Sequence, residues 1–291
     1  KLVDVVSNPE FLREGEAIRD FIYPDRVVIG TDSKKANRIL KSLYFPIIKK
    51  TTRYFNTSRR GAELIKYASN AFLATKISFI NEIANLCEKT GVDIKDVSQG
   101  MGSDERIGDR FLRAGPAYGG SCFPKDTRAL IDTGNQFKTD LTIIKSVVNS
   151  NDNRKTLLIN RVVKILGGNL KNKIITFLGV TFKPNTDDMR EATSIPMIKY
   201  LNKKNSKIKY YDPSGVKADF KNLKNVNYCN TISFACLNAD MVILHTEWND
   251  FKLLNFKKLV KKQKFKIFDM RNMYSPSRMK KLNIDYYGVG R

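Results

Sequence analysis

The segment KIITFLGV, residues 173–180, has the composition of a buried β-strand, with β-branched and aromatic residues ending at a glycine. Similar short apolar segments follow it at KIKYYDP (207–213), DMVILHT (240–246), KIFDM (266–270) and DYYGV (285–289). Segments with helical periodicity lie between them, at SIPMIKYLNKK (194–204) and FKKLVKK (256–262). Strands that alternate with helices predict an α/β fold, in which a parallel sheet is covered on both faces.

Before this region the chain is mostly helical. Apolar residues recur at helical spacing from 61 to 90, and Gly91 follows as a helix-ending glycine. This predicts one helix of about 30 residues, roughly 45 Å long. Shorter helices are predicted at DIKDVSQGM (93–101), at about 124–134 and at about 140–166, and the polar segment GGNLKNK (167–173) is the expected domain boundary.

The first 55 residues contain two expected strands, DVVSNPEF (4–11) and RVVIG (26–30), and a helical segment at 34–48. The chain begins with Lys1 instead of Met, inside an expected strand, which favours a fragment, a split-gene product or a trimmed sequence. We therefore divide the chain into a strand-containing N-terminal part (1–55), a helical middle (56–166) and a C-terminal α/β domain (167–291).

The net charge is +23, which suits nucleic acid, membrane surfaces or small anions as partners. The basic residues are dispersed, the densest run being KKLVKKQKFK (257–266), and no zinc-finger, RNP or basic-zipper pattern occurs. We favour lysines spread over solvated faces, and expect no nucleic-acid partner. No apolar run approaches the roughly 18 residues of a membrane span, and no signal-peptide pattern is present, so we expect a cytoplasmic protein without a membrane partner.

The cysteines, Cys87, Cys122, Cys229 and Cys236, include no CxxC pair, so we expect no metal site. Scattered cysteines without a signal suggest a reducing cytosol. The single histidine, His245, argues against serine-triad chemistry. Cysteine, lysine and carboxylates would have to carry any catalysis.

Cys122 lies in AYGGSCFPKDTRAL (117–130), two residues before Pro124, which suits the first turn of a helix. A helix N-terminus favours an anion and therefore a thiolate, and Lys125 adds positive charge. Asp126 lies one turn further on and can hold a water or a hydroxyl. A buried cysteine beside a tight turn would explain the thiol alone, but the whole group favours a nucleophile.

Three other sets of residues are candidates. Lys66 and Asn70 share one face of the long helix, and Lys66 is either a surface lysine or an ammonium that stabilises an oxyanion. Glu10 and Glu14 follow the first expected strand. Lys183, Arg190 and Arg271 follow strands at the sheet edge where α/β sheets bind ligands, which makes Lys183 and Arg190 candidate phosphate partners.

Seven segments, in order along the chain, resemble the nucleotide-sugar dehydrogenases of the UDP-glucose/GDP-mannose dehydrogenase family: SNPEFLREG (7–15), PDRVVIG (24–30), ELIKYASNAFLA (63–74), DERIG (104–108), GGSCFPKD (119–126), LGVTFKPNTDDMREATS (178–194) and DMRN (269–272). FPKD and PDRVVIG are more similar to the UDP-glucose branch than to relatives that act on GDP-mannose or UDP-N-acetylmannosamine. The resemblance implies oxidation of UDP-glucose to UDP-glucuronate with two NAD and one water, through a cysteine thiohemiacetal and thioester. It also implies a domain for each part of the chain. Residues 1–55 would be the end of an NAD-binding domain, 56–166 a central dimerisation and catalytic domain, and 167–291 a Rossmann-like UDP-sugar-binding domain.

The resemblance also implies roles for individual residues. Cys122 matches the nucleophile, Lys66 the oxyanion-stabilising lysine, Asn70 and Asp126 the pair that orients water and proton transfers, and Glu10 the glutamate of thioester hydrolysis. The implied substrate-binding residues are Phe11, Leu12, Arg106, Phe111, Arg113, Tyr118, Gly119, Lys183 and Arg271, with Arg106 reaching the neighbouring subunit's site. Glu14, Lys125 and Arg190 are the implied NAD-facing residues. The long helix matches the dimer-forming helix of the family, which implies a homodimer.

The sequence departs from the family in one respect, because it has no GxGxxG motif to hold the NAD pyrophosphate. A threonine that the family contributes upstream is also absent. We therefore expect the chain to be inactive alone, or to be completed by a separate N-terminal NAD-binding half. Three alternatives remain: an inactive remnant that binds nucleotide sugar or dimerises, a related dehydrogenase of UDP-N-acetylmannosamine or GDP-mannose, and, ranked far lower, a basic nucleic-acid-binding protein.

Overall fold

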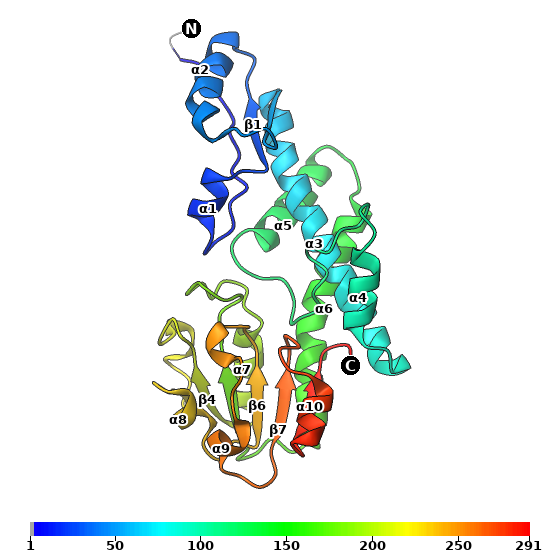
Figure 1. Cartoon of the computed structure of the whole chain (residues 1–291), viewed down its shortest axis with the longest axis vertical. Helices are drawn as coiled ribbons and strands as arrows, with labels where there is room; N and C mark the ends of the chain where they lie inside the picture. Colours follow the sequence, from blue (N-terminus) through cyan, green and yellow to red (C-terminus); the bar gives the residue numbers. More distant parts are fainter. Residues whose placement is uncertain (1–2) are drawn as a thin grey trace.

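The computed structural model describes residues 3–291 as an elongated molecule, with the N-terminal segment at one end and a six-stranded sheet at the other (Figure 1). Parallel strands with helices between them confirm the predicted α/β class. A long helix, α3 (Arg59–Thr90), connects the N-terminal end of the molecule to its centre (Figure 1).

The N-terminal part is a small β–α–β unit. Strands β1 (Arg26–Gly30) and β2 (Arg53–Thr57) pair in parallel, and α2 (Lys34–Tyr44) connects them through a short 3₁₀ turn, η1 (Phe45–Ile47). A six-residue helix, α1 (Ala17–Ile22), precedes them. Strand β1 and helix α2 were predicted from the sequence, although the predicted helix continued to residue 48, and β2 was not predicted.

The strand expected at 4–11 is wrong. Only one antiparallel bridge forms there, between Ser7 and Gly30. Pro9 has no N–H to donate to a ladder, and the side chain of Asn8 donates to the carbonyl of Val28 at 3.0 Å. Because a side chain and a proline replace the regular backbone pairing, the segment stays irregular.

Helix α3 begins at Arg59, two residues before the predicted start, because the Ser58 hydroxyl accepts a hydrogen bond from the N–H of Gly61. It ends at Thr90, as predicted, because Gly91 takes the left-handed conformation with φ 73°. The three other predicted helices of this region are present as α4 (Ile94–Gly102), α5 (Phe123–Gln136) and α6 (Thr142–Ile165).

The C-terminal sheet has the strand order β5-β4-β3-β6-β7-β8, and all its strands are parallel. Its strands are β3 (Ile174–Leu178), β4 (Lys207–Tyr211), β5 (Val226–Tyr228), β6 (Met241–Leu244), β7 (Lys266–Asp269) and β8 (Asp285–Gly288). The predicted α7 (Ser194–Lys203) and α9 (Phe256–Val260) are present; β5, α8 (Ile232–Cys236), α10 (Pro276–Lys281) and the 3₁₀ turns η2 (Ala218–Phe220) and η3 (Asn249–Phe251) were not predicted.

The strand order reverses between β3 and β6, which is where doubly wound sheets bind ligands beyond the carboxyl ends of the strands. Figure 1 shows the arrowheads of β6 and β7 pointing toward the helical part of the molecule. The fold therefore directs the ligand-binding edge of the sheet at the helices that carry Cys122.

One apolar core joins the central helices to the sheet. Ile80 and Ala84 of α3 and Leu158 of α6 belong to the same buried cluster as Phe177 of β3 and Phe268 of β7. A second cluster covers the opposite side of the sheet, and includes Val242, Phe256 and Met279. Burying such side chains stabilises a fold by about 1.5–3 kcal/mol each, so the helices and the sheet pack as one unit.

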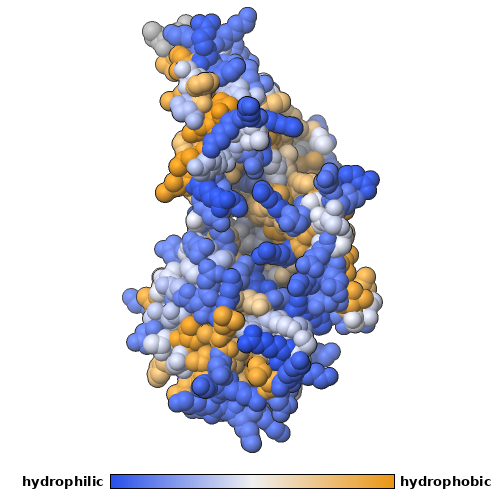
Figure 2. All heavy atoms as spheres, in the orientation of Figure 1, coloured by the Kyte–Doolittle hydropathy of each residue, from blue (hydrophilic) through white to orange (hydrophobic). Residues whose placement is uncertain are grey.

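The N-terminal part is less well covered. Ile18, Phe21, Ile22 and Tyr23, in or next to α1, are 43–79% exposed. Figure 2 shows apolar side chains over this end of the molecule, while most of the visible surface is hydrophilic. No helix in residues 3–291 has the length and apolar character needed to cross a membrane.

Candidate functional site

Cys122 lies at the start of α5, as the sequence predicted. It is the residue before the first helical residue, Phe123, and Pro124 occupies the first turn. The thiol is half-buried, and Ser121 Oγ lies 3.5 Å from its sulfur. The first N–H groups of a helix have no intrahelical acceptor, so the backbone here favours an anion beside the thiol.

Asp126, one turn beyond Cys122, is almost completely buried at 1% exposure. Its Oδ2 accepts a hydrogen bond from the Asn70 amide at 2.6 Å, and Lys125 Nζ lies 2.5 Å from Oδ1. The packing of α3 against α5 therefore unites Asn70 with Asp126, although 56 residues separate them. A carboxylate held in this way keeps a fixed orientation toward groups that approach the thiol.

Lys66 lies one turn before Asn70 on α3, and its ammonium points to the N-terminal segment. Nζ donates to the backbone carbonyl of Glu10 at 2.6 Å and lies 3.1 Å from Oε1 of the same residue. Two cations lie near the Phe11 ring, with the Arg26 guanidinium 3.9 Å and the Lys66 ammonium 5.5 Å from its centroid.

The segment 10–15 also contacts the C-terminal domain. Lys183 Nζ donates to the carbonyl of Glu14 at 2.6 Å, and the hydroxyl of Thr186 donates to the Glu14 carboxylate. A Cβ on Gly15 would lie 2.8 Å from the carbonyl oxygen of Asn185, so this close approach requires glycine. Burial lowers the pKa of Lys183 from its ordinary value. The N-terminal segment thus connects α3 to the loop that follows β3.

Three cations, Lys125, Lys183 and Arg190, lie within electrostatic range of the Cys122 thiol. Hydrogen bonding to Asp126 raises the pKa of Lys125, hydrogen bonding to Asp188 raises the pKa of Arg190, and burial lowers the pKa of Lys183. Arg190 forms an ion pair with Asp188 and has a side chain that is 67% exposed. These cations give the site a positive potential that suits an anionic substrate.

Arg271 lies at the carboxyl end of β7, on the edge of the sheet that faces the helices. Its Nε donates to the carbonyl of His245 and its Nη2 to the carbonyl of Phe182, both at 2.9 Å. Its Nη1 faces Gly115, where a Cβ would lie only 3.2 Å away. Its Nε also forms an ion pair with the Glu247 carboxylate at 2.8 Å, so both backbone carbonyls and a carboxylate orient this guanidinium at the edge of the sheet.

His245 does not titrate near neutral pH. It is completely buried, and burial lowers its pKa to about 3. The imidazole therefore stays neutral, which agrees with chemistry based on cysteine, lysine and carboxylates.

The remaining predicted residues are more dispersed. Phe111 and Tyr118 pack against Phe123, each with ring centroids 6.1 Å apart, and burial raises the pKa of Tyr118. Leu12 is half-buried, and Arg113 is exposed. The Arg106 side chain is 89% exposed and forms an ion pair with Asp104, so the structure does not bring it to Cys122.

Gly119 and Gly120 have a packing role as well as the predicted closeness to a ligand. A Cβ on Gly119 would lie 2.6 Å from the carbonyl oxygen of Glu191, and one on Gly120 would lie 2.7 Å from the Phe182 ring. The N–H of Gly120 donates to the carbonyl of Arg190 at 2.8 Å. The two glycines therefore let the segment 115–122, called the thiol loop below, lie directly on the loop that follows β3.

Sequence reasoning missed several buried polar residues next to this loop. Asn81, Asn151 and Arg154 are 2–4% exposed, and all three hydrogen-bond to backbone groups of residues 115–118. Glu191 was missed too. The available signal was polar residues at positions where α3 and α6 should be apolar.

Three family models match the chain. The NAD binding domain of the UDP-glucose/GDP-mannose dehydrogenase family matches residues 1–48, its central domain residues 60–153, and its UDP binding domain residues 176–276. Together with the doubly wound sheet and the thiol at its open edge, these matches define a nucleotide-sugar dehydrogenase architecture. The chain belongs to the UDP-glucose/GDP-mannose dehydrogenase family.

Individual relatives agree with this assignment. The chain is 46% identical to UDP-glucose 6-dehydrogenase of Rickettsia felis over 99% of its own length and 65% of that protein. It is 44% identical to UDP-glucose 6-dehydrogenase of Rhizobium meliloti over 99% of the chain and 67% of the relative. A UDP-glucose dehydrogenase structure from Pyrobaculum islandicum superposes with a TM-score of 0.88 at 34% identity, covering 99% of this chain and 63% of that one. The chain thus spans about two thirds of the length of these relatives.

Proposed function

We propose that this chain provides the substrate-binding and thiol chemistry of an NAD-dependent UDP-glucose 6-dehydrogenase, which oxidises UDP-glucose to UDP-glucuronate. The observation that carries the proposal is the arrangement of Cys122 and Asp126 on the first turn of α5, with the Asn70 amide hydrogen-bonded to that carboxylate. The names of the relatives support glucose as the sugar of the substrate, and the match to the UDP binding domain supports UDP as its nucleotide.

Cys122 acts as the nucleophile. Its thiolate adds to the carbon of the C6 aldehyde that the first oxidation produces, and the carbonyl oxygen becomes an alkoxide. The ammonium of Lys66 and the amide of Asn70 stabilise this oxygen. The second oxidation converts the thiohemiacetal into a thioester that remains bonded to Cys122.

Hydrolysis then releases the acid. Asp126, oriented by its bonds to Asn70 and Lys125, holds the attacking water, and Glu10 accepts its proton. The water oxygen bonds to the thioester carbon, the carbon–sulfur bond breaks, and Cys122 leaves as thiolate. Glu10 is bonded to Lys66, so substrate binding must rearrange that pair to bring both groups to the reacting carbon.

Positive charge at the sheet edge binds the UDP-sugar. Lys183 and Arg271 contact the diphosphate, since both lie where ligands bind in doubly wound sheets. Phe11, Leu12, Phe111, Arg113, Tyr118 and Gly119 shape the rest of the pocket, and Arg106 contacts the site of the neighbouring subunit, which its exposure on one protomer permits.

Glu14, Lys125 and Arg190 are the residues of this chain that we assign to NAD. Lys125 and Arg190 are exposed cations beside Cys122, and Glu14 lies on the segment that joins α3 to the loop after β3. NAD, when bound, supplies the hydride acceptor for each of the two oxidations. The sequence has no glycine-rich motif for the pyrophosphate, so that part of the binding comes from a further NAD-binding half. The exposed apolar side chains around α1 are available to contact it.

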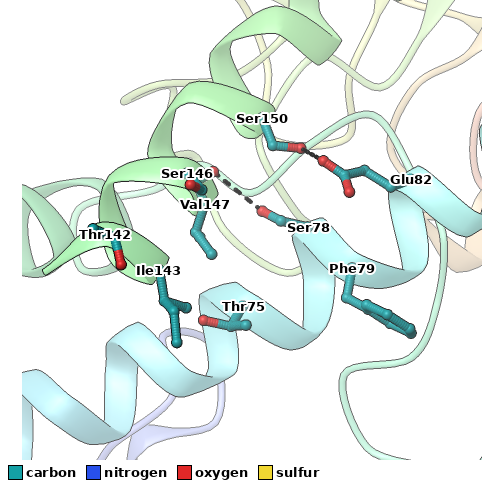
Figure 3. Close-up of a pocket in the computed structure, with 9 residues that line it drawn as sticks. All are labelled: Thr75, Ser78, Phe79, Glu82, Thr142, Ile143, Ser146, Val147 and Ser150. Atoms are coloured by element: carbon teal, nitrogen blue, oxygen red, sulfur yellow. Dashed lines mark hydrogen bonds between the residues drawn. The ribbon is translucent and has the colours of Figure 1, made fainter.

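The protein forms a homodimer through α3. Leu64, Phe72, Phe79 and Leu86 on this helix are 46–66% exposed and follow one another at steps of seven or eight residues, which is the spacing of a helix–helix contact. Beside them, α3 and α6 form a groove of about 290 Å³ that Phe79 and Ile143 line (Figure 3). Within this proposal, the four free cysteines of the described residues match a reducing cytosol.

Calorimetric titration of the purified chain tests the substrate part of this proposal. We expect saturable binding of UDP-glucose, and weaker binding of GDP-mannose and UDP-N-acetylmannosamine. If none of the three binds, the chain is a remnant without a working pocket, and the proposal is wrong.

Turnover tests the chemistry. When the chain is completed by an NAD-binding half, we expect UDP-glucose to reduce NAD, and Cys122→Ala to abolish UDP-glucuronate formation. Cys229→Ala, which removes a buried thiol beyond β5, serves as the control and should remain active. Equal turnover in the two variants would exclude Cys122 as the nucleophile.

A further inference from the structure

Side chains of α6 hydrogen-bond to the backbone of the thiol loop. Asn151 accepts a hydrogen bond from the N–H of Tyr118 at 2.9 Å and donates one to its carbonyl at 3.2 Å. Asn151 is 4% exposed. A side-chain amide that hydrogen-bonds to both the N–H and the carbonyl of one residue fixes the position of that backbone. A neighbouring strand in a sheet bonds to backbone groups in the same way.

Gly115 is held in the same way by two further side chains. Its N–H donates to Asn81 Oδ1 at 2.9 Å, and its carbonyl accepts from Arg154 Nε at 2.7 Å. Arg154 Nη1 also donates to the Asn81 carbonyl and to Asn85 Oδ1, both at 3.0 Å. One guanidinium therefore connects α6, α3 and the loop.

This arrangement has a high desolvation cost. Arg154 is 4% exposed, and burial lowers its pKa to about 10, so it remains charged at neutral pH. Transferring such a charge from water costs several kcal/mol, and apolar residues would fill the same space more favourably. A requirement for a defined loop geometry explains why these polar groups are present.

The opposite side of the loop contacts the candidate site. Arg271 Nη1 packs against Gly115, and Gly119 and Gly120 lie on Glu191 and Phe182. Cys122 follows four residues after Tyr118. A displacement of residues 115–118 would therefore move both the thiol and the arginine assigned to the diphosphate.

We propose that Asn151, Arg154 and Asn81 are positioning residues, which hold the backbone of residues 115–118 and thereby place the Cys122 thiol at the N-terminus of α5 and the Gly115 backbone against the Arg271 guanidinium. This assignment rests on the proposed function of Cys122 and Arg271, and the experiments below separate the two. None of the three residues contacts the reacting atoms; each acts through the loop.

Hydrogen exchange of the whole chain tests the contact directly. In the wild-type protein, we expect the amides of Gly115 and Tyr118 to exchange at least about 100-fold more slowly than in an unstructured peptide. Asn151→Leu should remove the protection of the Tyr118 amide, because it deletes the acceptor. Arg154→Lys should reduce the protection of the Gly115 amide, because it releases the carbonyls of Gly115 and Asn81, while β6 and β7 stay protected in both variants. Unprotected amides in the wild-type protein would overturn the proposal without any variant.

Alkylation of Cys122 by iodoacetamide, followed by mass spectrometry at neutral pH, tests the consequence. We expect Asn151→Leu and Arg154→Lys to slow the reaction by about fivefold, because the thiol loses its place beside the helix N-terminus. The same variants should weaken UDP binding. Arg161→Lys is the matched control: Arg161 lies two turns further along α6 and bonds to Glu88 and the Gly288 carbonyl. This control should leave alkylation unchanged.

The outcomes distinguish the two proposals. Faster or unchanged alkylation in both variants, with the loop amides exposed, would mean that the three residues only stabilise the fold, and would overturn the positioning role. Slower alkylation in a chain that neither binds UDP-glucose nor turns it over would support the positioning role and refute the proposed function.

Discussion

Glu191 connects the loop that follows β3 to helices α5 and α6 through one side chain. Its carboxylate accepts from Arg128 of α5 at 3.0 Å and from Lys155 of α6 at 2.9 Å. Its backbone is in the left-handed region at φ 54°, which is unfavourable for a residue other than glycine. The two ion pairs offset this strain and fix the loop on which Gly119 lies.

Glu191→Gln should therefore destabilise the protein by about 1 kcal/mol at pH 7, as measured by urea unfolding. Hydrogen bonding to Lys155, and then to Arg128, lowers the pKa of Glu191. A carboxyl whose pKa is lowered by folding stabilises the protein above its ordinary pKa of about 4.3, and this stabilisation is lost as the pH falls through the folded value. The difference between wild type and variant should thus shrink below about pH 4.

Asp140→Asn is the control for this prediction, because Asp140 pairs with Lys145 on an exposed surface. We expect a change within about 0.5 kcal/mol. An equal cost for both variants would show that Glu191 contributes no more than a surface ion pair.

Gly120 combines a left-handed backbone, φ 78°, with a ring in the space that a side chain would occupy. Gly120→Ala should destabilise the protein by about 1–3 kcal/mol and slow Cys122 alkylation, since Phe182 or the loop must shift. Gly100→Ala on α4, where nothing lies within 4 Å of the added Cβ, should be neutral or stabilising by up to about 1 kcal/mol. Thermal unfolding measures the stability of both variants. A neutral Gly120→Ala would contradict the packing argument.

At the scale of the element, α3 has two functions on two faces. Its buried face carries Asn70 toward α5 and Ile80 into the common core, while Phe72 and Phe79 remain 66% and 46% exposed. An exposed apolar stripe on a long helix is rarely left uncovered in solution.

Phe72→Glu and Phe79→Glu should convert a dimer to monomers in analytical ultracentrifugation, because a buried carboxylate without a partner would cost several kcal/mol at the interface. Phe137→Glu, at an equally exposed site at the end of α5, should leave the mass unchanged. A monomeric wild-type protein would refute dimerisation through α3.

At the scale of the whole molecule, charge and topology act together. The net charge of +23 and the cations at the open edge of the sheet give a positive field toward the candidate site. UDP binding should therefore weaken several-fold between about 50 mM and 500 mM NaCl, as the Debye length falls. Uridine, which is uncharged, should bind with little salt dependence under the same calorimetric conditions. An equal loss of affinity for UDP and for uridine with rising salt would argue against recognition of the diphosphate.

Local sequence patterns determined most of the elements. Helical periodicity and Gly91 define α3, and β-branched runs define β3, β4, β6 and β7, because these signals depend on neighbouring residues. They failed where a segment is short or polar, as at β2 and β5, and where Pro9 interrupts an apolar run. The position of Cys122 before α5, with Asp126 one turn further on, was also local information.

Only the tertiary structure decided which side chains meet. Asn70 bonds to Asp126 across 56 residues and Lys183 to Glu14 across 169, and Asn151 and Arg154 hold a loop more than 30 residues away. Such contacts depend on how helices and sheet pack, and no local pattern encodes that packing. The sequence by itself thus determined the residue types and their places on helices and strand ends. The packing of α3, α6 and the sheet around a common core determined which of these residues lie close together.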